Sequence, residues 1–100
     1  MSVSTPKWTV DPYEVTIQGK LPMTRYQDYF VRRLGCPEIE LFGLTRHTAH
    51  DLIREALMFY GHDSNTAAGL ATKIGTGTVN LWGIEYQRTM TVWRVERGWI

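Results

Sequence analysis

The chain has 100 residues, of which 43% are hydrophobic and 21% charged, and its formal net charge is +1. This length fits one domain with a modest core, and this composition excludes an intrinsically disordered chain. The nearly neutral charge argues against both a strongly cationic nucleic-acid binder and an acidic mimic of DNA. We therefore expect a single globular domain over residues 1–100, with residues 1–7 as a loose lead-in.

Cysteine content and hydropathy indicate the cellular compartment of the protein. Cys36 is the single cysteine, so no internal disulfide can form, which fits a reducing compartment. Residues 1–7 are polar and lack the apolar core of a signal peptide. No run of about 18 apolar residues is present that could span a membrane. These features predict a cytoplasmic protein without a membrane partner.

The first half of the chain predicts a strand, a helix and a second strand. Residues 8–21 are rich in Thr, Val, Tyr and Ile, a composition typical of a strand. Residues 24–34 predict a helix, which begins at a capping box formed by Thr24 and Gln27 and ends at the following glycine. Residues 38–44 predict a short strand, with alternate apolar side chains on one side.

The clearest element is a helix over residues 46–60. Thr45 is a good N-cap, and Gly61 suits the position just after the helix end. The apolar residues recur at helical spacing and predict one buried face, made of Ala49, Leu52, Ile53, Ala56, Leu57 and Tyr60. A shorter helix follows over residues 66–74, with Asn65 as its N-cap.

Beyond Gly77 the pattern supports two interpretations. Residues 79–86 and 89–95 are rich in β-branched and aromatic side chains, which favours a hairpin. The competing interpretation is a third helix over residues 78–88, which Gly83 would weaken. With the hairpin, the predicted fold class is α+β, in which an antiparallel sheet carries two or three helices packed on one face.

Residues capable of catalysis or metal binding do not converge. His47 and His50 lie on one side of the predicted helix, but about 20 Å of helix separates them from His62. A metal site needs three or four converging ligands. Cys36 follows a helix end, where the helix dipole disfavours a thiolate. No glycine-rich loop could hold a phosphate. The sequence therefore predicts no enzyme, no catalytic residue, no metal and no cofactor.

A helix-turn-helix motif is one interpretation of residues 70–84. The apolar and turn positions of that motif are matched by Leu70, Ala71, Ile74, Gly75, Leu81 and Ile84, and the segment resembles the DNA-reading head of phage repressors. The second helix lacks most base-reading side chains, since it would offer the major groove Gly77, Val79, Trp82 and Gly83. This interpretation predicts a phage regulator with duplex DNA as its partner.

The last quarter of the chain, residues 78–100, concentrates the side chains that most often anchor protein interfaces. A hairpin there would be apolar on both faces, and a helix layer covers only one of them. We therefore expect partner contacts from Trp82, Tyr86, Arg88, Trp93, Arg94 and Arg97, with Arg32 and Arg33 as rim charges. Closure of a core by the same aromatic side chains is the competing interpretation.

Small single-domain chains with many aromatic anchors and no catalytic motif resemble the inhibitors made by phages and mobile elements, anti-CRISPR proteins among them. The resemblance rests on this overall character rather than on an alignable motif. It implies a non-enzymatic protein-binding module that captures a bacterial defence complex in the host cytosol. Such a module would block nucleic-acid access to that complex or one of its conformational steps. The identity of the partner, the oligomeric state and the source organism stay open.

Overall fold

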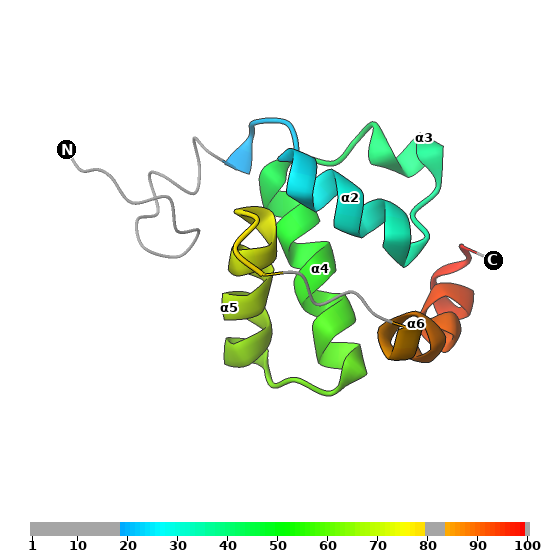
Figure 1. The fold of residues 1–100 in the computed structure, drawn as a ribbon. Coiled ribbons are helices and arrows are strands. Elements are labelled where there is room, and N and C mark those ends of the chain that lie inside the picture. Colours follow the sequence, from blue (N-terminus) through cyan, green and yellow to red (C-terminus); the bar gives the residue numbers. More distant parts are fainter. Residues whose placement is uncertain (1–18, 80–83, 100) are drawn as a thin grey trace.

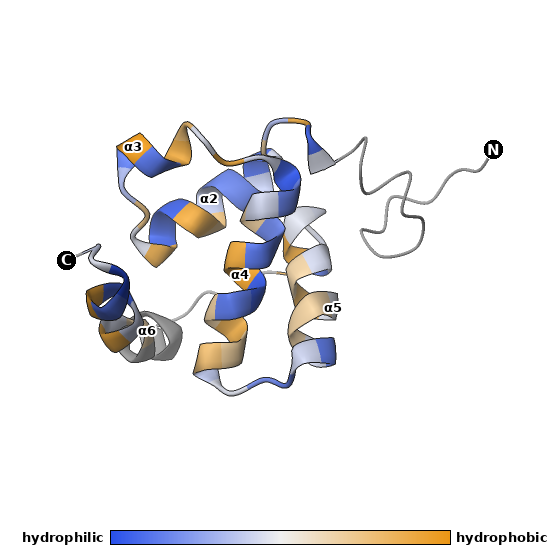
Figure 2. Ribbon diagram, turned by 180° about the vertical axis from the view of Figure 1, so that it is seen from behind, coloured by the Kyte–Doolittle hydropathy of each residue, from blue (hydrophilic) through white to orange (hydrophobic). Residues whose placement is uncertain are grey.

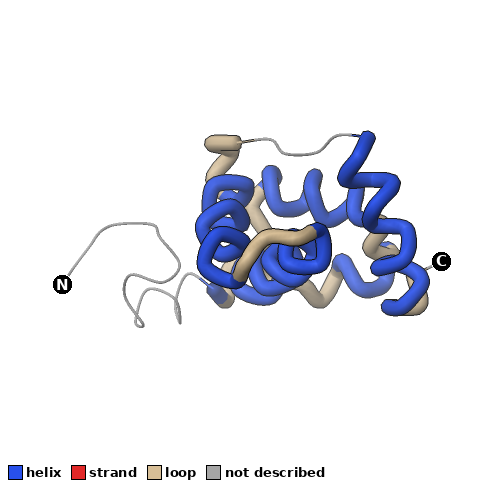
Figure 3. The backbone as a smooth tube through the Cα atoms, turned by 90° about the horizontal axis from the view of Figure 1, so that it is seen from below, coloured by secondary structure: helices blue, strands red, loops and turns tan. Residues whose placement is uncertain are grey.

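The structure, a computed structural model, describes residues 19–79 and 84–99 (Figure 1). Within these ranges the chain forms five helices: α2 (Arg25–Leu34), α3 (Glu38–Leu41), α4 (Arg46–Tyr60), α5 (Ser64–Gly75) and α6 (Ile84–Arg97). The described residues hold an isolated bridge between Pro22 and Thr45 but no sheet (Figure 3). The predicted α+β fold with an antiparallel sheet is therefore wrong, and this part of the chain is mostly helical.

The strands predicted over residues 38–44 and 89–95 are wrong. Residues 38–44 form α3 and the turn after it, and residues 89–95 lie within α6. In α6 the buried side chains Met90 and Trp93 are three residues apart, which is helical spacing. Packing of this stripe against α4 outweighs the β propensity of Thr and Val, because propensity is weak compared with burial.

Parts of the predicted elements lie outside the described residues. These are the body of the first predicted strand, residues 8–18, and the start of the C-terminal segment, residues 80–83. Of the third helix proposed over residues 78–88, the described residues Thr78 and Val79 precede the helix, and α6 begins at Ile84.

The prediction of α2 is confirmed in detail. Thr24 Oγ1 accepts a hydrogen bond from the Gln27 backbone N–H at 3.0 Å, and the Thr24 N–H donates to Gln27 Oε1 at 3.1 Å. This reciprocal pair is the capping box that the sequence predicts. The helix ends at Gly35, whose φ of 103° is left-handed and suits glycine.

The central helix α4 is also confirmed, with Thr45 as its N-cap and Gly61 after its end. It contacts α2, α5 and α6, and Figure 1 shows α5 and α6 on opposite sides of it. The following helix α5 begins two residues earlier than predicted. Asp63 Oδ1 accepts from the Thr66 N–H at 2.7 Å, so Asp63 rather than Asn65 is the N-cap.

Hydrogen bonds from Gln27 and Thr24 join three of these helices at one end of the molecule. Gln27 has no solvent exposure, and its Nε2 donates to the Arg46 carbonyl at 3.1 Å, at the start of α4. Beside it, Thr24 Oγ1 donates to the Gly75 carbonyl at 2.8 Å, at the end of α5. The N-terminus of α2 is therefore hydrogen-bonded to both neighbouring helices around the apolar core.

The C-terminal helix α6 closes the core from the other side. Met90 and Trp93 are 1% and 5% exposed and belong to the same hydrophobic cluster as the buried face of α4. Arg94 Nε donates to the Leu34 carbonyl at the end of α2. None of the helices in the described ranges combines the length and the apolarity needed to cross a membrane.

Candidate functional site

Two of the predicted contact residues, Trp93 and Arg97, form a compact cluster with Trp99 at the C-terminal end of α6. Trp93 and Trp99 meet edge to face, with ring centroids 5.2 Å apart. The Arg97 guanidinium lies 4.8 Å from the Trp93 ring and 5.0 Å from the Trp99 ring, distances at which a cation is attracted to the aromatic face. Arg97 Nη1 also donates to Glu55 Oε1 at 2.9 Å. This cluster joins α6 to α4.

Two of the predicted contact side chains make contacts within the molecule. Trp93 is almost fully buried, and Arg94 donates to α2. Trp82 lies outside the described residues, and so do the side chains of Tyr86 and Arg88. The contacts predicted for these six residues therefore stay predictions. Trp93 has the core-closing role of the competing interpretation, and the bond from Arg94 to α2 is one that sequence reasoning missed.

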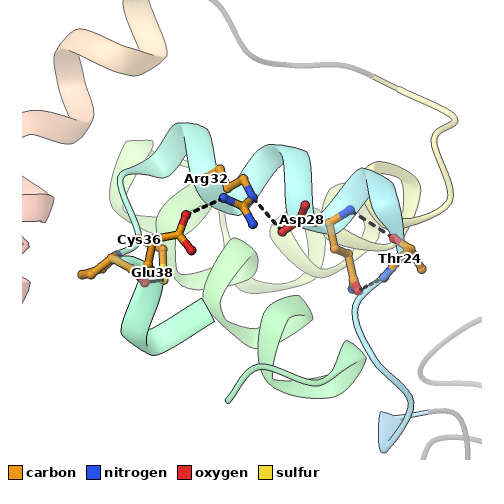
Figure 4. A network of polar contacts seen from close by, with 7 residues as sticks. Thr24, Asp28, Arg32, Cys36 and Glu38 are labelled. Carbon is orange, nitrogen blue, oxygen red and sulfur yellow. Dashed lines mark hydrogen bonds and ion pairs between the residues drawn. The ribbon is translucent and has the colours of Figure 1, made fainter. Parts of the chain in front are cut away.

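The two predicted rim charges lie on the exposed side of the last turn of α2. Arg32 is held between Asp28 at 3.0 Å and Glu38 at 2.9 Å, the second of which belongs to α3 (Figure 4). The Arg33 guanidinium lies 5.0 Å from the Tyr29 ring. Because Arg32 already bridges two carboxylates, its main visible effect is to hold α3 against α2.

The most exposed large apolar side chains belong to α3. Ile39 is 81% exposed and Phe42, just after the helix, is 88% exposed. Leu41, in contrast, is buried in the core at 7% exposure. Figure 2 shows this hydrophobic segment at the periphery of the fold. We call Ile39 and Phe42 the apolar pair.

Sequence reasoning missed the apolar pair because it treated residues 38–44 as a strand. In a strand, Ile39 and Leu41 share a face. In a helical turn, Ile39 and Phe42 share a side, and Leu41 points elsewhere. The sequence marks the start of this helix only weakly, because its N-cap is Pro37, which makes no side-chain capping bond.

The histidines and the cysteine show no arrangement typical of an active site. His50 is 4% exposed, and burial lowers its pKa to about 4, so that it is neutral at physiological pH. Burial, followed by the charge of Glu40, raises the pKa of the Cys36 thiol, which disfavours the reactive thiolate. In the described part of the chain, no three potential ligands among His, Cys, Asp and Glu gather as a metal site would require.

The predicted helix-turn-helix coincides only in part with the described helices, because residues 70–75 lie in α5 but the described residues 76–79 are not helical. Thr76–Val79 form a turn after α5, with Gly77 packed beneath the ring of Tyr26. A Cβ on Gly77 would lie 2.5 Å from Tyr26 Cζ. Thr78, at the start of the expected recognition helix, is therefore non-helical, and Gly77 before it lies against an aromatic side chain of α2.

Comparison with known proteins identifies no relative of this chain. No protein-family model matches the sequence, and neither a curated protein nor a solved structure matches it. Functional assignment therefore depends on the geometry of this chain alone.

Proposed function

We propose that the protein is a non-enzymatic binding module that captures another protein through the exposed side of α3. The observation that supports this proposal is the apolar pair, because Ile39 and Phe42 are more than four-fifths exposed on a firmly attached element. Adjacent apolar side chains that a monomer leaves in water mark interaction surfaces more often than isolated ones do.

The energy available from this pair is enough for an interface anchor. Burial of an Ile or Phe side chain contributes about 1.5–3 kcal/mol, so that the two together contribute about 3–6 kcal/mol. Alanine scanning finds hot spots of this size at the centres of protein interfaces. The free energy of binding is less, since association also costs translational and rotational freedom.

The attachment of α3 reduces the entropic cost of binding. Glu38 is paired with Arg32, and Leu41 inserts into the core, so both ends of this short helix contact the body of the protein. A preorganised anchor loses less conformational entropy when it binds. The module would then act by rigid complementarity, with Arg32 and Arg33 near the rim of the contact.

A bacterial defence complex is the partner that we propose, in keeping with the resemblance to phage-encoded inhibitors. The protein would bind such a complex stoichiometrically and block its access to nucleic acid or one of its conformational steps. A purified CRISPR effector complex is the direct target for measurement. Tight capture with inhibition of target cleavage supports this narrower proposal, and absence of capture by a panel of such complexes contradicts it.

The test of the binding surface is a double variant, Ile39→Ser/Phe42→Ser. Both side chains are exposed, so the free energy of unfolding should stay within about 0.5 kcal/mol of wild type. Capture of the partner should weaken at least tenfold. The matched control is Val92→Ser/Val95→Ser, which removes two apolar side chains of α6 that are 55% and 54% exposed.

Self-association is the outcome that would contradict this proposal. We expect sedimentation to show a monomer at micromolar concentration for both the wild type and the double variant. A wild-type dimer that the Ile39→Ser/Phe42→Ser variant dissociates would mean that the apolar pair contacts a second copy of this chain.

The alternative, a DNA-binding regulator, stays a prediction without a supporting observation in the described residues. Its signature is binding to duplex DNA that weakens steeply with salt. Such binding, together with wild-type behaviour of the double variant, would replace the proposal above.

A further inference from the structure

Two adjoining hollows that share Glu55 and Arg97 form a shallow groove along α4, the first part next to α3 and the second next to α6. Its first part, with a volume of about 250 Å³, is lined by Glu40, Leu44, Asp51, Leu52 and Glu55. Its second part, with a volume of about 530 Å³, is lined by Glu55, Met58, Phe59, Trp93 and Glu96. Arg97 borders both parts, and its ion pair with Glu55 separates them. We call the two parts together the acidic groove.

The floor of the acidic groove has helical periodicity. Leu52 and Phe59 are seven residues apart on α4, which places them two turns, or about 10 Å, apart along its axis. Met58 and Phe59 are 42% and 40% exposed, so the second part offers substantial apolar surface. Leu52 is only 7% exposed, so in the first part the half-buried Leu44 supplies most of the apolar surface above it. The two parts have the spacing of residues i and i+7 of a helix laid along α4.

The rim of the groove is predominantly negative. Carboxylates of Glu40, Asp51 and Glu96 surround it, whereas the guanidinium of Arg97 is already paired with Glu55 and lies against two indole rings. His47 lies 3.4 Å from Asp51 and adds a positive charge only when it is protonated. This excess of carboxylates attracts a cationic partner and repels an anionic one.

We infer that the acidic groove binds a basic amphipathic helix of the partner protein. Apolar side chains at positions i and i+7 of that helix enter the two parts of the groove, and its Lys or Arg side chains pair with the rim carboxylates. This inference rests on the proposed function and adds the chemistry of the partner. It uses a surface separate from the apolar pair, because neither Ile39 nor Phe42 lines the groove.

The test uses a synthetic peptide as the probe. A fluorescein-labelled helical peptide of about 14 residues carries leucines seven positions apart and lysines on both flanks. A second peptide replaces each lysine with glutamate. Fluorescence anisotropy in 50 mM salt should show binding of the lysine peptide at least tenfold tighter than binding of the glutamate peptide. Raising the salt to 300 mM should weaken binding of the lysine peptide, because exposed charges are screened.

Variants locate the binding to the groove. Asp51→Asn/Glu96→Gln should weaken binding of the lysine peptide about three- to tenfold, and Phe59→Ser about tenfold. The control is Asp28→Asn, which removes a carboxylate of α2 outside the groove, keeps the ion pair between Arg32 and Glu38, and should leave binding unchanged. Equal binding of the two peptides, or wild-type binding by Asp51→Asn/Glu96→Gln, would overturn the inference.

The Ile39→Ser/Phe42→Ser variant separates this inference from the proposed function. We expect it to bind the lysine peptide as wild type does, although its capture of the partner is at least tenfold weaker. If it captures the partner normally, the proposed function of the apolar pair fails, while the peptide measurements still decide the inference about the groove.

Discussion

Arg94 lies so close to Gly35 that a side chain at position 35 would collide with it. A Cβ on Gly35 would come within 2.7 Å of Arg94 Cδ and 2.8 Å of Arg94 Nε. The same guanidinium donates to the Leu34 carbonyl, one of the carbonyls that the end of a helix leaves without an intrahelical partner. The Arg94 side chain therefore caps the C-terminus of α2 and attaches α6 to it.

The variant Gly35→Ala should be strongly destabilised. Alanine is strained at a φ of 103°, and its Cβ would displace Arg94 from the end of α2. We expect the free energy of unfolding to fall by about 2 kcal/mol or more, measured by urea denaturation. Gly69→Ala is the matched control. No atom lies within 4 Å of a Cβ there, and removing a helix-interior glycine should stabilise the protein by about 0.5–1 kcal/mol. Equal effects of the two substitutions would contradict the proposed contact.

Truncation of Trp93 should lower the stability of the fold rather than remove a direct contact with the partner. Trp93→Ala removes a side chain that is 5% exposed and the ring on which Arg97 stacks. We expect a loss of about 3–5 kcal/mol of stability, read from thermal and urea unfolding. The amount of partner that the variant binds should then be proportional to the fraction of the variant that is folded. A stable Trp93→Ala protein that no longer binds would restore Trp93 as a direct contact.

The variant Gln27→Glu should be destabilised in a pH-dependent way. Gln27 Nε2 donates to the Arg46 carbonyl from a fully buried position, and a carboxylate there would place two acceptors against each other. We expect a loss of about 2–3 kcal/mol at neutral pH. Because a protonated carboxyl can donate, the difference in unfolding free energy from wild type should shrink as pH falls. A difference that stays constant with pH would mean that Gln27 acts through shape alone.

Protonation of His50 should destabilise the fold in mildly acidic solution. Burial lowers its pKa in the folded protein to about 4 from an ordinary value of 6.5. Between these values the unfolded chain binds a proton that the folded chain does not, so the free energy of unfolding rises with pH. The contribution of His50 is complete above about pH 6.5 and is lost as pH falls to about 4, a change on the order of 3 kcal/mol. Urea denaturation of His50→Gln across this range should show a shallower pH dependence than wild type. If the unfolding free energy of the variant depended on pH as steeply as that of wild type, other titrating groups would be its cause.

Local signals predicted the helices whose ends carry strong capping residues. Thr24 with Gln27, and Thr45 with Gly61, mark α2 and α4 because caps act within one turn of the chain. The α3 and α6 segments lack signals of comparable strength. Val, Thr and Trp around Met90 favour a strand locally, and only the packing of Met90 and Trp93 against α4 makes them helical.

The candidate surfaces were harder to predict from the sequence than the helices were. Arg32 and Arg33 were correctly placed on the exposed end of α2. The exposure of Ile39 and Phe42, however, depends on how α3 is oriented by Leu41 and by the ion pair between Glu38 and Arg32. Composition cannot distinguish an aromatic side chain that closes a core from one that faces water.

The sequence by itself determined where α2 and α4 begin and end, because capping and helical periodicity depend on residues a few positions apart. Only the tertiary structure decided that Trp93 and Arg94 join α6 to the body of the protein while α3 presents Ile39 and Phe42 to solvent. The physical reason is that burial depends on contacts between residues distant in sequence. Arg94 and Leu34, sixty positions apart, are joined by a hydrogen bond that no local pattern encodes.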